Sequence, residues 1–391
     1  MIQRLQASNI QRIWTSGKSI LLLGPRQTGK TTLAEKFEYD LQINFLSTRV
    51  RQAYERDPDL LIKEVHALRQ TKIPKVLIDE VQKVPEIMDP IQLLIDKKKA
   101  QFFITGSSAR KLKQQSDINL LPGRVISFRL DGFSSEEFEQ KKIEESLYYG
   151  SLPGVALTAD SSSKEELLQT YVEVYLEEEI RKEARLKKLP DFYRFLQHAA
   201  AQAGHVCSYS SIAQDIGVSH VTVKSYYEIL ESTMIADRID PLVISQTRKK
   251  LIKSPRYLFF DMGVRRLAAQ EGVDQPQVHM GHLLEQWVGL EIQKYIRNHK
   301  SKASLHFWQD PERAEVDWVI NVEKNYIPIE VKLTSNPQEK DCKHLLTFQQ
   351  EYPCKHGAYL VSTIPRPQKM KSGVHMIPWQ NLTQLLSDFL K

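Results

Sequence analysis

Cysteine, long apolar runs and a strong excess of one charge are all scarce in this sequence, and each absence excludes a class of protein. The 391 residues include 3 cysteines, Cys207, Cys342 and Cys354. Their spacing gives neither a zinc-ligand pattern nor a disulfide framework, which excludes a disulfide-stapled miniprotein and suits a reducing compartment. The apolar run near the start covers only residues 20–23 and ends on a glycine. Because it is too short for a signal peptide or a membrane span, we expect a cytoplasmic protein with no membrane partner.

The charge balance is nearly even, with 54 Lys and Arg against 48 Asp and Glu, a formal net charge of +6. That excess permits an acidic partner such as nucleic acid but does not argue strongly for one. The 41% of hydrophobic and 26% of charged residues are those of an ordinary folded chain, which excludes low-complexity, fibrous and disordered classes. The length allows two or three domains with ample cores.

The clearest motif follows the apolar residues 20–23 and reads GPRQTGKTT over residues 24–32. The order predicts a strand, a loop and a helix, and residues 24–31 match G-x-x-x-x-G-K-[ST] at every fixed position. The two glycines let backbone N–H groups face phosphate oxygens. Lys30 would supply positive charge to the β- and γ-phosphates, and the Thr31 hydroxyl would bind Mg²⁺. A chance glycine-rich turn ahead of a helix is the alternative.

A second apolar segment, residues 75–78, ends in two acids and follows the helix-breaking Pro74. Buried parallel strands have this pattern. At the carboxyl end of such a strand, Asp79 can hold the water shell of Mg²⁺ and Glu80 can polarise an attacking water as a general base. The start of an ordinary loop is the alternative.

A third apolar segment, residues 101–104, is followed by small polar residues. It would place the hydroxyls of Thr105 and Ser107 beside the γ-phosphate, although a simple turn rich in Gly and Ser has the same composition. Arg124 comes directly after a turn and could reach a phosphate across a subunit boundary. An exposed arginine is more often only solvated.

The segments GPRQTGKTT, KVLIDEVQ, ITGSSARKL and LPGR together resemble the AAA+ superfamily. More narrowly, they resemble the bacterial and archaeal ATPases in which an AAA domain precedes a C-terminal domain of unknown function, and the resemblance covers nearly the whole chain. It implies ATP and Mg²⁺ as cofactors, a homo-oligomer, a magnesium site at Asp79, catalysis by Glu80, a sensor at Ser107 or Ser108 and an arginine finger at Arg124. It implies phosphate binding by Gly24, Pro25, Arg26, Gln27, Thr28, Gly29, Lys30, Thr31 and Thr32.

The middle of the chain predicts a helical lid and linker followed by a helix-turn-helix. The charged residues 177–182 are most simply a solvated helix face with i,i+4 pairs, and a junction that signals between domains is the alternative. Residues 208–219 predict a short helix closed by Gly217, and residues 220–230 predict a second helix capped by Ser219. Its buried side would consist of Val221, Tyr226, Ile229 and Leu230.

Residues 242–260 resemble two strands around a basic tip at Arg248, Lys249 and Lys250, so the unit is interpreted as a winged helix. From Val218 to Lys253, the sequence has six basic and four acidic residues. A domain that binds double-stranded DNA usually carries a larger excess of positive charge. DNA binding and protein contact both remain open for this unit.

Near the end, residues 315–333 contain two strand-like runs around a polar turn. With residues 324 and 325 as the turn, Asp317 lies opposite Lys332. Cross-strand partners share a face and side chains alternate, so Asp317, Glu330 and Lys332 project together. Two carboxylates can hold a divalent cation while the lysine orients or activates water for attack on a phosphodiester. An exposed cross-strand ion pair is the alternative.

This pattern resembles the core of the PD-(D/E)XK nucleases. The C-terminal domain of the ATPase group named above commonly carries it as EVDFVI and PIEVK, which appear here as EVDWVI and PIEVK. The resemblance implies that Glu285, on a helix that starts near residue 281, joins Asp317 and Glu330 as a metal ligand beside Lys332. A fold of this kind can also bind nucleic acid without cutting it.

We therefore expect an α/β protein with four segments. They are a P-loop AAA+ parallel-sheet core (1–132), a helical lid and linker (133–190), a mainly helical winged-helix domain (191–275) and an α/β PD-(D/E)XK nuclease-like domain (276–391). The favoured function is an oligomeric ATPase that couples turnover to the binding or processing of nucleic acid, most simply DNA, with metal-dependent DNA cleavage left open. The alternative is a nucleotide-dependent switch whose C-terminal half only docks a protein or DNA partner. A metabolic P-loop kinase is disfavoured, because the later segments have no place in one.

Overall fold

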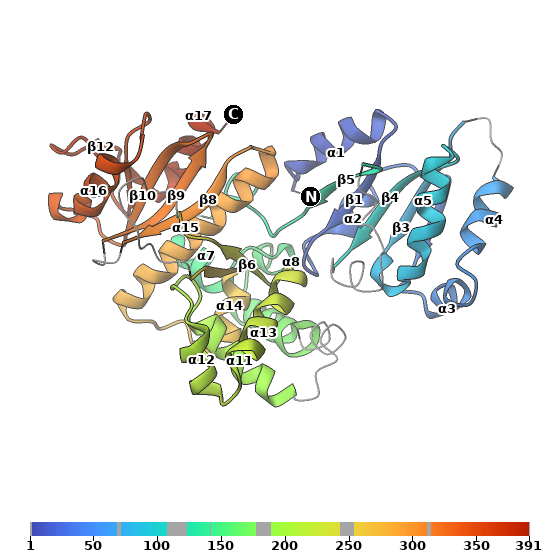
Figure 1. The fold of residues 1–391 in the computed structure, drawn as a ribbon, viewed down its shortest axis with the longest axis horizontal. Helices are drawn as coiled ribbons and strands as arrows, with labels where there is room; N and C mark the ends of the chain where they lie inside the picture. Colours follow the sequence, from blue (N-terminus) through green and yellow to red (C-terminus); the bar gives the residue numbers. More distant parts are fainter. Residues whose placement is uncertain are drawn as a thin grey trace.

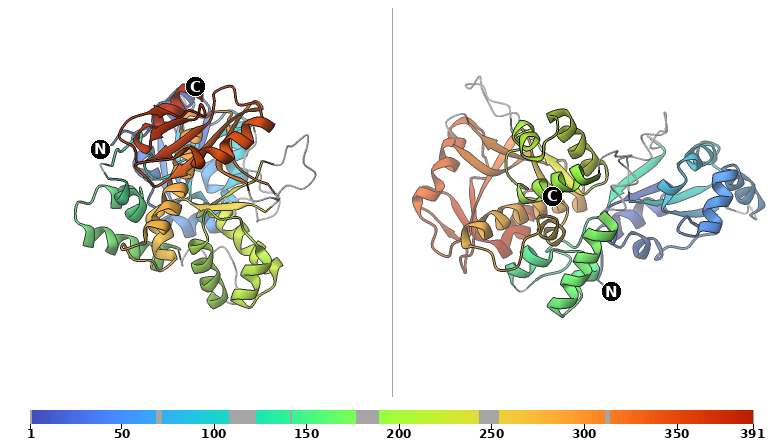
Figure 2. Two further views of the ribbon diagram at one scale, coloured as in Figure 1. Left: turned by 90° about the vertical axis from the view of Figure 1, so that its left-hand side faces the viewer. Right: turned by 90° about the horizontal axis from the view of Figure 1, so that it is seen from below.

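The computed structural model describes residues 2–68, 72–107, 123–140, 142–176, 189–242, 254–310 and 314–390. Figure 1 shows one sheet at each end of the molecule, with the helices from the middle of the chain gathered beside and between them. The right-hand view in Figure 2 also shows the two sheets at opposite ends of the molecule. We call the part from α1 to β5 the N-terminal unit, the part from α7 to α14 the middle unit and the part from α15 to α17 the C-terminal unit.

The sheet of the N-terminal unit is fully parallel, in the order β2-β3-β4-β1-β5. Its strands are β1 (Ser19–Leu23), β2 (Leu41–Asn44), β3 (Lys75–Asp79), β4 (Gln101–Gly106) and β5 (Val125–Arg129). Its α-helices are α1 (Gln6–Thr15), α2 (Lys30–Ala34), α3 (Thr48–Arg56), α4 (Leu60–Ala67) and α5 (Met88–Asp96).

Helices cover both faces of this sheet (Figure 1). In β1 the side chain of Leu21 belongs to an apolar core that includes residues of α3, α4 and α5, whereas Ile20 and Leu22 belong to a second core with residues of α1 and α2. Alternate residues of each strand are therefore buried on opposite faces, which explains the continuous apolar runs. The predicted parallel α/β sheet at the start of the chain is confirmed.

The middle unit is mainly helical. Its helices are α7 (Ile143–Tyr149), α8 (Pro153–Ala156), α9 (Ser161–Thr170), the π-helical turn η3 (Tyr171–Leu176), α11 (Leu189–Ala201), α12 (Tyr209–Ile216), α13 (His220–Ser232) and α14 (Met262–Ala268). Two antiparallel strands, β6 (Ala236–Ile239) and β7 (Arg256–Phe259), complete it. The charged run at 177–182 and the basic tip at Arg248, Lys249 and Lys250 lie outside the described residues.

The two helices predicted over residues 208–230 are α12 and α13. Gly217, at φ 74°, ends α12, and the Ser219 hydroxyl accepts a hydrogen bond from the N–H of Thr222, as its predicted capping role requires. The prediction that Val221 is buried is wrong, because its side chain is 63% exposed. The buried stripe of α13 instead starts at Val223, whose helical phase matches that of Tyr226 and Leu230, whereas residue 221 lies on the opposite side.

The C-terminal unit is built on a six-stranded mixed sheet in the order β12-β13-β11-β10-β9-β8. Its strands are β8 (Ser304–Gln309), β9 (Glu315–Val322), β10 (Asn325–Lys332), β11 (Tyr359–Ser362), β12 (Gln368–Lys369) and β13 (His375–Pro378). The helices α15 (Gln277–His299) and α17 (Leu382–Phe389) pack on one face, and α16 (Lys343–Glu351) packs on the other. Helix α7 contributes Ile143 and Leu147 to the core under α15, so the middle and C-terminal units share apolar packing.

The hairpin between β9 and β10 differs from the prediction in its register. Its turn consists of Glu323 and Lys324, at φ 51° and 68°, and Val322 pairs with Asn325. The predicted turn at residues 324 and 325, and with it the pairing of Asp317 with Lys332, is wrong. Both central residues have the positive φ that a tight two-residue hairpin turn needs. The error is two residues, so the side chains keep their predicted face.

Within the described parts of the chain, no helix is both long enough and apolar enough to cross a membrane.

Candidate functional site

The loop between β1 and α2 has the backbone that its sequence predicts. Gly29 has φ 90°, in the left-handed region that favours glycine. At Gly24 a Cβ atom would lie 2.2 Å from the carbonyl oxygen of Leu130, so no side chain fits. Gly24 therefore lets the loop pass close to Leu130, just after β5.

Lys30 and Thr31 start α2 and face the ends of the neighbouring strands. The Lys30 side chain is 5% exposed, and its Nζ atom donates to the carbonyls of Gly24 (2.9 Å) and Pro25 (2.8 Å). The Thr31 hydroxyl lies 3.3 Å from each carboxylate oxygen of Asp79. A hydroxyl and a carboxylate facing each other across a phosphate loop are hard oxygen ligands of the kind that Mg²⁺ takes. In chemistry and placement, these residues fit Mg²⁺.

Asp79 and Glu80 follow β3 and are held by hydroxyl and amide groups. Asp79 is buried and accepts a hydrogen bond from the hydroxyl of Thr105, at the end of β4. The N–H of Glu80 donates to the same hydroxyl (3.2 Å). Glu80 has φ 61°, an unusual backbone for a residue other than glycine, and such conformations cluster at functional sites.

Gln82 joins Glu80 to Ser107 and was missed by the sequence reasoning. Its Nε2 atom donates to Glu80 Oε2 (2.6 Å) and to Ser107 Oγ (2.8 Å). Thr105 thus contacts Asp79, whereas Ser107 reaches Glu80 through Gln82. The signal was present in KVLIDEVQ, because a residue two positions after Glu80 in a 3₁₀ turn can return to it. Ser108, the other predicted sensor, lies outside the described residues.

Arg124 does not lie beside this loop in the same chain. It precedes β5, whose first residue, Val125, pairs with Ser19 at the start of β1, whereas the loop follows the end of β1. Its guanidinium pairs with Asp96 through contacts of 2.6 and 3.0 Å. A role for Arg124 at the site of a neighbouring subunit remains a prediction.

Arg4, a second residue that the sequence reasoning missed, ties the loop to the rest of the protein. Its side chain is almost buried and donates to the carbonyls of Thr28 and Asp131, at 2.7 Å each. It also pairs with Glu137 at 3.0 Å. No motif marks Arg4, because its partners lie 24 to 133 positions away.

Asp131 belongs to a cluster of four charged side chains that joins all three units. We call Arg129, Asp131, Asp237 and Arg297 the junction cluster. Arg129 pairs with Asp237 of β6 (2.6 Å) and with Asp131 (2.9 Å), and Arg297 of α15 reaches Asp131 (3.1 Å) and Asp237 (2.9 Å). Burial alone would raise the pKa values of the two acids, but the two guanidinium groups hold them below their ordinary values.

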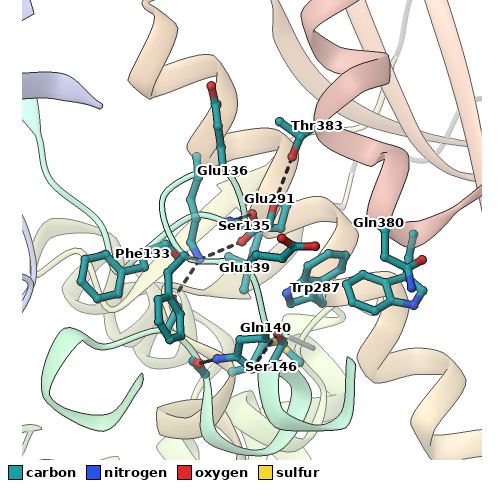
Figure 3. Close-up of a pocket in the computed structure, with 17 residues that line it drawn as sticks. Phe133, Ser135, Glu136, Glu139, Gln140, Ser146, Trp287, Glu291, Gln380 and Thr383 are labelled. Atoms are coloured by element: carbon teal, nitrogen blue, oxygen red, sulfur yellow. Dashed lines mark hydrogen bonds and ion pairs between the residues drawn. The ribbon is translucent and has the colours of Figure 1, made fainter. Parts of the chain in front are cut away.

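A cavity of about 230 Å³ lies where residues 133–151 meet α15 and the start of α17, and Figure 3 shows the residues that line it. At this cavity the buried Lys294 donates to the carbonyl of Phe133 (2.9 Å) and pairs with Glu291 (3.0 Å). Glu291 in turn accepts a hydrogen bond from the N–H of Ser135 (2.7 Å). These interactions satisfy the buried charges from within the chain. The cavity is therefore best explained as part of the seam between the middle and C-terminal units.

The four residues predicted for a nuclease-like site are brought together. Glu285, Asp317, Glu330 and Lys332 line one cavity of about 450 Å³, together with Glu315 of β9 and Arg256 of β7. We call these six residues the carboxylate pocket. Asp317 Oδ2 accepts from the N–H of Val331 (2.7 Å), and Lys332 Nζ lies 2.6 Å from Glu330 Oε1.

Negative charge is concentrated in this pocket. Burial raises the pKa of Asp317 well above its ordinary value, and the carboxylates of Glu285 and Glu330 act in the same direction. Burial also raises the pKa of Glu330, with Lys332 opposing it. Burial alone would lower the pKa of Lys332, but the carboxylates of Asp317 and Glu330 outweigh burial and raise that pKa. Among the described residues, nothing donates a hydrogen bond to Oε2 of Glu330. Charge and an orphaned oxygen thus favour a cation here.

The geometry, however, does not fit a metal ion. Across the described ranges, no three His, Cys, Asp or Glu side chains are arranged to hold a metal together. Glu285 is turned toward Arg256, which contacts it at 2.7 Å. The predicted ligands are thus neighbours in one pocket but do not form a metal site in this arrangement.

Three family models match the chain in succession. An AAA domain model matches residues 16–139, and two domains of unknown function, DUF8612 and DUF4143, match residues 140–276 and 280–382. An uncharacterized protein of Mycobacterium tuberculosis is 23% identical over 86% of this chain and 75% of its own length. An uncharacterized protein of Methanocaldococcus jannaschii is 22% identical over 94% of this chain and 85% of its own length.

Three solved structures match this chain with low scores. Pif1 helicases on forked double-stranded DNA match with a TM-score of 0.25 and 14% identity, over 44% of this chain and 52% of theirs. Drosophila ORC bound to AT-rich DNA and Cdc6 matches with a TM-score of 0.25 and 8% identity, over 68% of this chain and 91% of its own. Protein VC1899 from Vibrio cholerae matches with a TM-score of 0.23 and 13% identity, over 95% and 97%. These scores are too low to carry an argument.

The AAA model covers the phosphate loop, Asp79 and Glu80, and the same residues converge at one edge of the parallel sheet. The chain therefore contains an AAA-type ATPase domain followed by two domains of unknown function.

Proposed function

We propose that this protein binds and hydrolyses ATP with Mg²⁺ at the loop between β1 and α2, and that turnover drives a C-terminal half that binds or processes nucleic acid. The observation that carries the proposal is the meeting of Lys30, Thr31, Asp79 and Glu80 where the parallel strands end. Each group then has a function in phosphoryl transfer to water.

Lys30 would exchange its hydrogen bonds to the loop carbonyls for contacts to the β- and γ-phosphates. Thr31 and Asp79 would hold Mg²⁺, which neutralises phosphate charge when it is bound. Glu80 would accept the proton of the attacking water, with Gln82 fixing the carboxylate from the side. Because Gln82 also contacts Ser107, the proposed base and the proposed sensor would move together.

Nucleotide binding tests the site most simply. We expect Lys30→Ala to lose most of its affinity for a fluorescent ATP analogue, since the charge facing the phosphates is removed. Lys36→Ala is the matched control, because Lys36 is exposed just beyond α2. Equal affinities of wild type and Lys30→Ala would overturn the assignment of the site.

Coupling to the other units is supported by Arg4 and the junction cluster. Arg4 joins the phosphate loop to Asp131 and Glu137, and Asp131 contacts Arg297 of α15. A loop that shifts on nucleotide binding would pull on both contacts. Because packed and ion-paired interfaces tend to have discrete arrangements, such a shift can be passed on rather than absorbed.

Action on nucleic acid is the less direct part of the proposal. Asp317, Glu330 and Lys332 share one pocket, which favours phosphodiester chemistry, whereas Arg256 in the same pocket favours docking without cleavage. The protein would be incubated with labelled single- and double-stranded DNA, ATP and Mg²⁺ or Mn²⁺, with both binding and cleavage recorded. Cleavage that is lost in Asp317→Ala and Lys332→Ala supports processing. Binding without cleavage supports a nucleotide-dependent switch, and the absence of both contradicts a role on DNA.

A further inference from the structure

Arg256 lies in the carboxylate pocket although it comes from the middle unit. It is the first residue of β7 and is 2% exposed. Its Nη1 atom donates to Glu285 Oε1 (2.7 Å) and to the carbonyl of Asp317 (3.2 Å), and its Nη2 atom pairs with Glu315. The guanidinium thus bridges two acids of the C-terminal unit.

Aromatic rings fix the guanidinium in this position. Its central carbon lies 4.5 Å from the ring centre of Phe307 and 5.5 Å from that of Trp318. Both rings belong to the C-terminal sheet, and both are fully buried. A planar cation held between carboxylates and aromatic faces is a strong and specific contact for arginine.

The charges of the pocket show what this contact does. Four carboxylates face Arg256 and Lys332 in this pocket. Lys332 pairs with Glu330, and Arg256 pairs with Glu285 and Glu315. His282 lies 3.9 Å from Glu285. A divalent cation held by Glu285, Asp317 and Glu330 would place its charge beside the guanidinium. The two cations would repel each other and compete for the same carboxylate oxygens.

Arg256 also has a mechanical link to the ATPase domain. Its strand β7 pairs with β6, and Arg256 itself lies opposite Ile239. Two residues before Ile239 is Asp237, which belongs to the junction cluster and contacts Arg129 at the end of β5. Movement of β5 would therefore act directly on the small sheet that holds Arg256.

We propose that Arg256 is a built-in counterion that occupies the carboxylates of Glu285 and Glu315, so that the pocket accepts a divalent cation only when β7 withdraws. This rests on the proposed metal-dependent processing of nucleic acid and adds its regulation. In the arrangement described here Arg256 occupies two acids of the pocket, and withdrawal of β7 would release them for a cation.

Binding of Mn²⁺ to the intact protein without nucleotide, followed by the electron paramagnetic resonance signal of free Mn²⁺, tests the proposal. Arg256→Met removes the charge and keeps an apolar stem between the rings. We expect its affinity to exceed that of wild type by about tenfold or more, as for the loss of one competing charge. The gain should disappear when Asp317→Asn is added. Arg238→Met, which removes a partly exposed arginine of β6, is the matched control and should bind as wild type does.

A second variant covers the case in which Arg256→Met does not fold, which thermal unfolding would reveal. Arg256→Lys keeps the charge but cannot bridge Glu285 and Glu315, so a smaller gain of about threefold is expected. Wild-type binding that depends on Asp317 and equals that of both variants overturns the counterion proposal and leaves the metal site intact. Binding that never depends on Asp317 contradicts the metal-dependent function as well.

Discussion

The junction cluster gives a prediction whose magnitude follows from its geometry. Arg297→Met would remove the guanidinium that lies 3.1 Å from Asp131 and 2.9 Å from Asp237. Two acids, whose side chains are 7% and 12% exposed, would then share the single guanidinium of Arg129. One buried negative charge would remain without a partner.

Breaking a buried ion pair by removing one partner costs about 3–5 kcal/mol. Arg129 still contacts both acids, and the Arg297 side chain is 21% exposed. We therefore expect the lower end of this range, a loss of about 3 kcal/mol in the free energy of unfolding at pH 7 to 8. Urea denaturation of the intact chain, followed by tryptophan fluorescence, would measure it.

The pH dependence separates charge from packing. In the wild type the arginines hold the pKa values of Asp131 and Asp237 below their ordinary values. The resulting stability is present above the unfolded-state pKa, near 4, and is lost as the pH falls through the lower folded values. In Arg297→Met these pKa values rise, so the acids protonate at a higher pH than in the wild type, and the difference in stability should shrink as the pH falls below about 4. A difference of the same size at pH 3 and pH 8 would refute the electrostatic account.

Three further predictions concern single side chains. Gln82→Ala should lower steady-state ATP turnover by about tenfold with little change in ATP affinity, because it removes only the group that orients the general base. Phosphate release would measure the turnover and nucleotide titration the affinity, and unchanged turnover would exclude this role for Gln82. Arg4→Ala should weaken ATP binding by about tenfold, the equivalent of one lost charge-assisted hydrogen bond to the Thr28 carbonyl, and wild-type affinity would argue against it. Val223→Asp, at a buried position, should lower the free energy of unfolding by about 3 kcal/mol or more, whereas Val221→Asp, at an exposed one, should change it by no more than about 0.5 kcal/mol. Equal losses of stability in thermal unfolding would contradict the placement of α13.

The residues of the ATPase site could be predicted because its signals are local. The phosphate loop and the pair Asp79 and Glu80 each lie within a few residues of an apolar strand, and parallel strands bring their ends to one edge. Gln82 was accessible by the same logic but is not part of the motif. Arg4 was not accessible, because a single arginine before the first helix carries no pattern.

The C-terminal hairpin shows where local reasoning ends. Glu323, Lys324 and Asn325 are all polar, so the residue types did not decide which two form the turn, and in the structure Glu323 and Lys324 form it. The side of the sheet on which Asp317 lies was still predicted correctly, because the register error was two residues and side chains alternate with a period of two. Arg256 was missed because its partners are reached only after the middle unit folds back on the C-terminal sheet.

The central claim is that Glu80 and its neighbours hydrolyse ATP, and phosphate release by Glu80→Gln tests it most directly. The variant should bind ATP about as tightly as the wild type, since Lys30 and Thr31 are intact. Its steady-state turnover should fall by about a hundredfold or more, the usual contribution of a general base. Turnover equal to that of the wild type, at saturating ATP and with unchanged binding, would contradict the account.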